Sequence, residues 1–269
     1  MQTVRPPAVA GMFYPGQASM LAATVQELLA EAAPRLGPGT PVPKALLLPH
    51  AGYVYSGSTA ALGYAALAPA RETVRRVVLL GPTHRVAVDG LALPEAEAFD
   101  TPLGRVPVAD PDPRTLARLP QVVVDREAHA MEHSLEVHLP FLQTVLDDFA
   151  LVPLAVGFAA AETVAEVLDA LWGGPETVVV VSSDLSHYLG YDEARRVDQA
   201  TLAQVLRLDG PLTHHQACGA TPANGLLVSA RRHGLTPRLL GSCSSGDTAG
   251  DRRRVVGYAA VAFVPPADA

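Results

Sequence analysis

The stretch Ala45-Leu46-Leu47-Leu48-Pro49-His50 runs from four apolar residues almost directly into a histidine. The pattern returns in Arg76-Val77-Val78-Leu79-Leu80-Gly81-Pro82-Thr83-His84, and again where Val178-Val179-Val180-Val181 leads into Ser182-Ser183-Asp184-Leu185-Ser186-His187. Short apolar runs of this kind are typical of strands buried on both faces of a parallel sheet. Because the carboxyl ends of such strands meet at one edge, we expect the three histidines to converge there in a metal or acid–base site.

Helix-length segments separate these apolar runs. Strands that alternate with helices predict an α/β fold, a three-layer sandwich whose mostly parallel central sheet is covered by helices on both faces. With no internal repeat or linker visible, we expect one domain over residues 1–269. The pattern predicts helices over 19–32, 57–67, 134–146, 160–172, 192–207 and 222–233, strands over 44–49, 75–81, 122–124, 149–156, 177–182, 238–241 and 255–263, and an extended stretch over 105–108.

Composition narrows the class of protein. The formal net charge is −7, from 20 Lys and Arg against 27 Asp and Glu, which argues against nucleic acid or an anionic membrane as a partner. No apolar run approaches the roughly 20 residues that span a bilayer, and the first residues do not follow the pattern of a signal peptide. Cys218 and Cys243 are the two cysteines, so we expect a reducing, cytoplasmic location.

The segment Glu132-His133-Ser134-Leu135-Glu136-Val137-His138 is dense in ionisable groups. If it is helical, Glu132 and Glu136 lie on one face. His133 or Glu136 could then orient the strand-end histidines, since a metal-bound imidazole needs its other nitrogen held. The alternative is an exposed helix whose charges face water.

Seven motifs together resemble the Memo family over nearly the whole chain. They are PAVAGMFYP at 7–15, PHAGYVYSG at 49–57, GPTH at 81–84, EHSLE at 132–136, SSDLSHY at 182–188, CG at 218–219 and VVGYAA at 255–260. The resemblance implies a fold like that of the LigB-type class III extradiol dioxygenases. It also implies membership of the AmmeMemoRadiSam system as its protein B, with an AMMECR-type protein and a radical SAM protein as partners.

The resemblance further implies a mononuclear metal held by His50 and His84, with iron expected first and copper or zinc as alternatives. It implies a proton-transfer role for His187, accompanied by Asp184. For the third ligand, a gap-free count back from Tyr258 reaches Thr248, which is a poor ligand. The candidates are then the adjacent Asp247, which would complete a triad of two histidines and a carboxylate, Cys243, five residues before Thr248, if the loop is shifted, or no protein ligand at all.

The remaining candidate residues are expected either to pack in the core or to line the pocket around the metal. We expect Cys218, beside a glycine at a helix start, to serve packing. The expected lining of the pocket consists of Tyr53, Tyr55, Glu132, His133 and Tyr188.

Three functions follow from these expectations. The first is a metal-dependent, dioxygenase-like redox enzyme acting on a small molecule or a modified residue. The second is a binding or adaptor protein that uses the same pocket for a peptide. The third is a zinc-dependent hydrolase, since two histidines and a carboxylate can also bind zinc and activate water.

Overall fold

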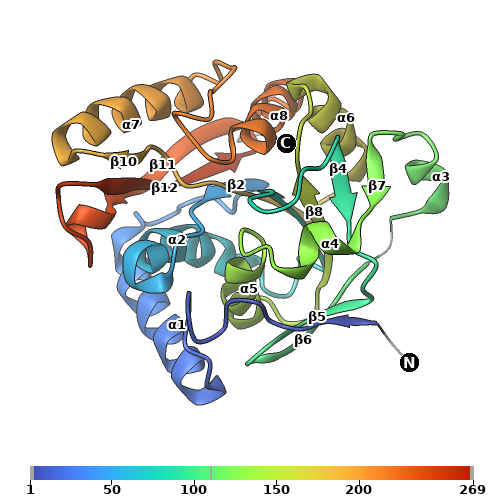
Figure 1. Cartoon of the computed structure of the whole chain (residues 1–269), viewed down its shortest axis with the longest axis horizontal. Helices are drawn as coiled ribbons and strands as arrows, with labels where there is room; N and C mark the ends of the chain where they lie inside the picture. Colours follow the sequence, from blue (N-terminus) through green and yellow to red (C-terminus); the bar gives the residue numbers. More distant parts are fainter. Residues whose placement is uncertain (1–2, 110, 267–269) are drawn as a thin grey trace.

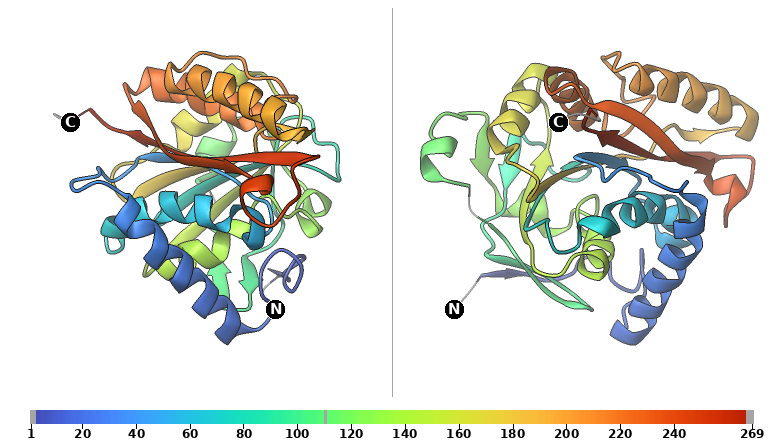
Figure 2. Two further views of the ribbon diagram at one scale, coloured as in Figure 1. Left: turned by 90° about the vertical axis from the view of Figure 1, so that its left-hand side faces the viewer. Right: turned by 180° about the vertical axis from the view of Figure 1, so that it is seen from behind.

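A nine-stranded mixed sheet forms the centre of the computed structural model, which describes residues 3–109 and 111–266. Its order is β10-β12-β2-β9-β3-β8-β4-β7, with β11 paired to β12. Helices cover both faces, so the predicted α/β sandwich is confirmed (Figures 1 and 2). The sheet strands are β2 (Ala45–Leu48), β3 (Arg76–Pro82), β4 (Leu91–Leu93), β7 (Val122–Val124), β8 (Ala150–Val156), β9 (Thr177–Ser182), β10 (His187–Leu189), β11 (Thr236–Ser244) and β12 (Val255–Val264).

Alternate residues of the central strands enter two separate cores. Leu46 and Leu48 of β2 pack in the core beneath one face, whereas Ala45 and Leu47 pack in the core on the other. This alternation is the period of two expected of a strand buried on both sides. The first core lies under α1 (Ala18–Ala32), α2 (Tyr53–Leu67) and α5 (Leu139–Val145), and the second under α6 (Ala161–Leu171), α7 (Tyr191–Leu206) and α8 (Ala220–Arg232).

Parallel pairing is concentrated in the middle of the sheet. Strands β2, β9, β3 and β8 run parallel to one another, as predicted, and β4 runs parallel to β7. In contrast, β10 and β11 both pair antiparallel with β12, β12 pairs antiparallel with β2, and β4 pairs antiparallel with β8. The last two long strands form a hairpin, because the segment between them is too short for the crossover that parallel pairing needs.

Most of the short elements lie outside the predicted pattern. A small second sheet joins β1 (Val4–Arg5), β5 (Ala98–Thr101) and β6 (Gly104–Pro107), and of these only β6 matches a predicted segment, the extended stretch over 105–108. Two short helices, α3 (Pro113–Leu116) and α4 (Arg126–Ala130), precede the segment predicted as a helix over 134–146. That segment is a 3₁₀ turn over Glu136–His138 followed by α5, with Pro140 in the first turn of α5, where its missing N–H costs nothing.

Glycine allows α2 to lie close to the sheet. A Cβ added to Gly63 would stand 2.5 Å from a methyl carbon of Leu48 in β2, so a larger residue there would force this buried side chain to shift. In the part of the chain described, no helix is long and apolar enough to cross a membrane.

Candidate metal centre

Three imidazoles come together at the carboxyl edge of the central strands. His50 follows β2, His84 follows β3, and His133 lies in the loop between α4 and α5. Each offers a ring nitrogen, and these nitrogens all lie within 4.8 Å of one another. Among residues 3–109 and 111–266 they form the one such group of histidine, cysteine and carboxylate donors. We call this set the histidine group.

Sheet order explains why two of these residues meet. Strand β9 lies between β2 and β3, so the segments leaving β2 and β3 flank the end of β9. His50 is 1% exposed, whereas His84 is exposed and His133 is half-buried. The histidine group therefore has one buried member and one side open to solvent.

Glu132 holds His84 and the loop that carries His133. Its Oε1 accepts hydrogen bonds from Nδ1 of His84 at 2.8 Å and from the backbone N–H groups of His133 and Ser134 at 2.9 Å each. Its Oε2 accepts the backbone N–H of His84 at 2.6 Å. Burial alone would raise the pKa of Glu132, but the hydrogen bonds from His84 and the backbone lower it to about 2. The ionised carboxylate fixes the proton of His84 on Nδ1 and leaves Nε2 free.

The other two imidazoles are kept neutral by burial. Burial lowers the pKa of His50 well below its ordinary value and that of His133 to about 4. Nδ1 of His133 lies 3.3 Å from Oε1 of Glu132, and Nδ1 of His50 lies 2.6 Å from Oγ of Ser182. Neutral imidazoles with one nitrogen engaged by the protein are suited to binding a transition metal through the other.

Asp184 and His187 lie beside the group, after β9. Oδ1 of Asp184 accepts the backbone N–H of His50 at 2.8 Å, and burial raises the pKa of this carboxyl to about 7. Nδ1 of His187 donates to the carbonyl of Leu185 at 2.8 Å, which leaves Nε2 available as a proton acceptor. Burial lowers the pKa of His187, and charge on His84 lowers it further. His187 is therefore a neutral base near the group.

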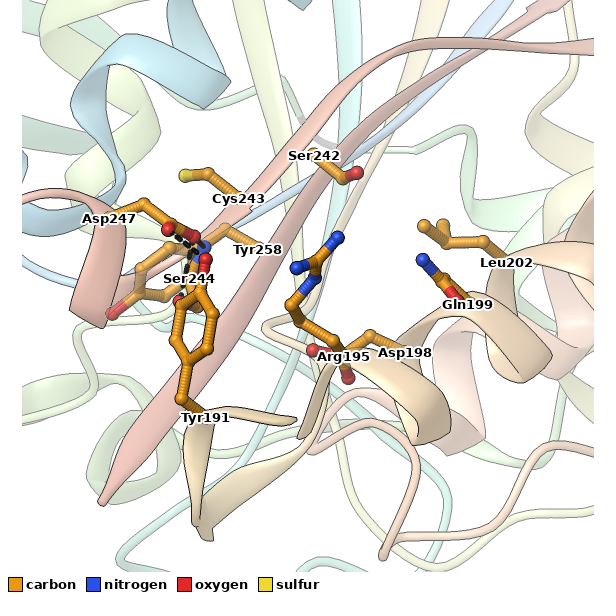
Figure 3. Close-up of a pocket in the computed structure, with 10 residues that line it drawn as sticks. All are labelled: Tyr191, Arg195, Asp198, Gln199, Leu202, Ser242, Cys243, Ser244, Asp247 and Tyr258. Carbon is orange, nitrogen blue, oxygen red and sulfur yellow. Dashed lines mark hydrogen bonds between the residues drawn. The ribbon is translucent and has the colours of Figure 1, made fainter. Parts of the chain in front are cut away.

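Neither Asp247 nor Cys243 belongs to the histidine group. Asp247 caps a 3₁₀ turn, where its Oδ2 accepts the backbone N–H and the hydroxyl of Ser244, both at 2.9 Å. Sγ of Cys243 lies 3.1 Å from Oγ1 of Thr59. Both line a cavity of about 260 Å³ between α7 and the β11–β12 hairpin (Figure 3). The third member of the candidate group is His133.

Cys218, which we expected to serve packing alone, contacts a member of the histidine group. Its Sγ is 3.3 Å from Nε2 of His50, and burial raises the pKa of the thiol to about 12. The sequence offered only the Cys-Gly pair before α8 as a sign of this contact, and that pair does not show which strand end the thiol lies against. Cys218 is a thiol neighbour of the buried histidine.

The three tyrosines expected to line the pocket occupy different environments. Tyr53 is buried and donates its hydroxyl to the carbonyl of Val137 at 2.7 Å, so it anchors the loop before α5. Tyr55 and Tyr188 are exposed. Tyr188 has a positive φ of 61°, and its ring lies 5.7 Å from that of His187. Tyr188 is thus the tyrosine next to the candidate base.

Fold and site together define a class: α/β proteins that carry a group of imidazole donors at the carboxyl edge of a central sheet. A family model described as "Memo-like protein" matches residues 5–262, and the chain belongs to the Memo family.

Curated relatives support this assignment along their whole length. A MEMO1 family protein of Aquifex aeolicus is 35% identical, over 97% of this chain and 99% of that protein. MEMO1 family proteins of Ignicoccus hospitalis and Archaeoglobus fulgidus are each 36% identical, over 98% and 97% of this chain and 99% of each relative. The crystal structure of an uncharacterized protein, JW3007, from Escherichia coli K12 covers 81% of this chain and 98% of its own at 15% identity, with a TM-score of 0.50. That last likeness shows a shared fold alone.

Proposed function

We propose that the chain is a mononuclear, metal-dependent redox protein of the dioxygenase-like type, acting on a small molecule or a modified residue. The observation that carries the proposal is the histidine group, in which His50, His84 and His133 offer nitrogens within 4.8 Å of one another. Imidazole donors suit iron, copper and zinc, and a set of three leaves positions open. Iron is the metal we expect first.

The open side of the group suits a substrate. A bound iron or copper ion would supply oxygen activation or electron transfer at the exposed face of His84. In this proposal His187 accepts a proton from a substrate hydroxyl through Nε2, which is supported by the hydrogen bond of its Nδ1 to the carbonyl of Leu185. Asp184, whose pKa burial raises to about 7, holds the backbone of His50 in place. As further parts of this proposal, the protein works in the cytoplasm with AMMECR-type and radical SAM proteins.

Metal content is the decisive test. We would purify the protein anaerobically without a metal-affinity tag and measure metals by elemental analysis, for the unaltered chain and for the double variant His50→Ala with His84→Ala. The matched control is His215→Ala with His233→Ala, which removes two histidines outside the group. We expect about one iron or copper per chain, lost only in the first variant, and oxygen consumption would then be screened.

Other results point elsewhere. Zinc lost from the first variant favours the hydrolase, because zinc has no redox chemistry. Absence of metal from every preparation, even after loading with Fe²⁺, contradicts the proposal and leaves the pocket as a binding site.

A further inference from the structure

The hydroxyl of Ser182, at the end of β9, is the junction of a buried polar chain behind the histidine group. Its Oγ lies 2.6 Å from Nδ1 of His50, 2.8 Å from Nε2 of His138 and 2.6 Å from the carbonyl oxygen of Ser134. Nδ1 of His138 in turn lies 2.7 Å from the hydroxyl of Tyr64 in α2. All five residues are buried.

The positions of the protons follow from what each group can donate. A carbonyl oxygen only accepts, and the hydroxyl of Ser182 is the group that donates to the carbonyl of Ser134. A hydroxyl has one proton and two lone pairs, so Ser182 must accept from both imidazoles. His50 therefore carries its proton on Nδ1, and His138 carries its proton on Nε2.

The far end of the chain agrees with this assignment. With its proton on Nε2, His138 has a bare Nδ1, which accepts the phenolic proton of Tyr64. Burial lowers the pKa of both imidazoles, that of His138 to about 3, so each ring carries one proton. With neutral rings, any other arrangement would place two donors or two acceptors face to face in the interior, where an unmade hydrogen bond costs about 1–3 kcal/mol. In this arrangement every donor and acceptor of the buried polar chain has a hydrogen-bond partner.

We propose that Ser182, His138 and Tyr64 are positioning residues that lock His50 in the tautomer with a bare Nε2, the one that can bind a metal. This inference rests on the proposed function, because it assigns these residues to the metal site. Nε2 is the nitrogen that faces Sγ of Cys218 at 3.3 Å, on the side where the thiol can donate to it.

The histidine group thus uses two devices to fix tautomers. At its exposed end, His84 is held by the carboxylate of Glu132. At its buried end, a hydroxyl, an imidazole and a phenol do the same for His50 with neutral groups alone.

The test reads the tautomers directly. We would label the histidines with ¹⁵N and record long-range ¹H–¹⁵N spectra of the metal-free protein near pH 7.5, assigning His50 and His138 by substitution. We expect a protonated Nδ1 with a bare Nε2 for His50, and the reverse for His138. A protonated Nε2 on His50 overturns the proposal.

Metal affinity supplies the second readout, with Co²⁺ as the probe. Ser182→Ala should leave His50 as a mixture of tautomers and weaken Co²⁺ binding by about 10–100-fold, the usual loss when the partner of a ligating histidine is removed. Tyr64→Phe should release the tautomer of His138 first and weaken binding less. The control is Ser229→Ala, which removes another buried serine hydroxyl, bonded to the carbonyl of Ala165 in α6.

The outcomes separate the two proposals. An unchanged tautomer of His50 and unchanged Co²⁺ affinity in Ser182→Ala overturn the locking role. The expected tautomers in a protein that binds neither Co²⁺ nor Fe²⁺ overturn the proposed function and, with it, the assignment of these residues to a metal site. Equal loss of affinity in Ser182→Ala and Ser229→Ala, with an unchanged His50 spectrum, also overturns the lock, because it indicates a general loss of stability.

Discussion

Replacing Glu132 by glutamine should weaken metal binding as well as the fold. The carboxylate is buried and accepts four N–H groups, three on Oε1 and one on Oε2. An amide that keeps its oxygen at the first position turns its NH₂ toward the backbone N–H of His84, whose present hydrogen bond is 2.6 Å long. One buried donor then loses its partner, at a cost of about 1–3 kcal/mol.

The effect on the metal site follows from the same contact. His84 loses both its hydrogen bond to a charged acceptor and the anchor of its backbone. Loss of such a partner typically weakens metal affinity about 10–100-fold, or about 1.4–2.8 kcal/mol. We would measure Co²⁺ dissociation constants by competition with a chromophoric chelator, and thermal unfolding of the metal-free protein in parallel.

Glu136→Gln is the matched control. Glu136 is buried in the same segment and also accepts four hydrogen bonds, from Arg5, the backbone N–H groups of Ala8 and Val9, and Tyr14. Its carboxylate makes no hydrogen bond to the histidine group. This variant should therefore unfold at a lower temperature but bind Co²⁺ with an affinity within about threefold of that of the unaltered protein. If Glu132→Gln retains full affinity while Glu136→Gln loses it, the reasoning is refuted.

Three further predictions concern stability. Burial raises the pKa of Asp184 to about 7, above the value near 3.9 of an unfolded chain, so this group should lower the stability of the metal-free protein as pH rises from about 4 to 7. Asp184→Asn should remove that slope in urea unfolding at several pH values, and an unchanged slope would count against it. Gly81→Ala places a Cβ 2.6 Å from Oγ of Ser134, which should lower the free energy of unfolding by about 1–3 kcal/mol. It should also weaken Co²⁺ binding, because Ser134 follows His133. A variant with the unfolding midpoint and the Co²⁺ affinity of the unaltered protein would contradict this. Arg5→Met leaves the carboxylate of Glu136 without its 2.7 Å ion pair and should cost about 3–5 kcal/mol in urea unfolding, and a loss under 1 kcal/mol would show that the pair is dispensable.

The central strands and the meeting of two histidines could be predicted from the sequence. Strands β2, β3 and β9 each contain a run of four apolar residues and lead into polar motifs, so both their burial and their shared edge follow from local pattern. His50 and His84 therefore lie together as expected. Strands β1 and β4, of two and three residues, carry too little periodicity to be recognised.

The third donor could not be derived from local pattern. His133 lies in a loop whose position depends on long-range contacts: Glu132 accepts the backbone N–H of His84, 48 residues away, and Ser134 donates its hydroxyl to the carbonyl of Pro82, 52 residues away. Asp247 looked like a ligand because carboxylates bind metals, but a carboxylate three residues after a serine also caps a turn, and that is its role here. Spacing along the chain does not distinguish these two uses.

The unequal exposure of the histidine group bears on how quickly an ion can come and go. The buried end at His50 is 1% exposed, whereas the side chain of His84 is 30% exposed. Small chelators and competing ions would reach a bound ion from the open end without any unfolding. Nitrogen donors favour copper over the other divalent ions of the first transition row, so selectivity in a cell depends on which ions are available. The occupant of such a site would reflect the metal pool in which the protein was made and handled.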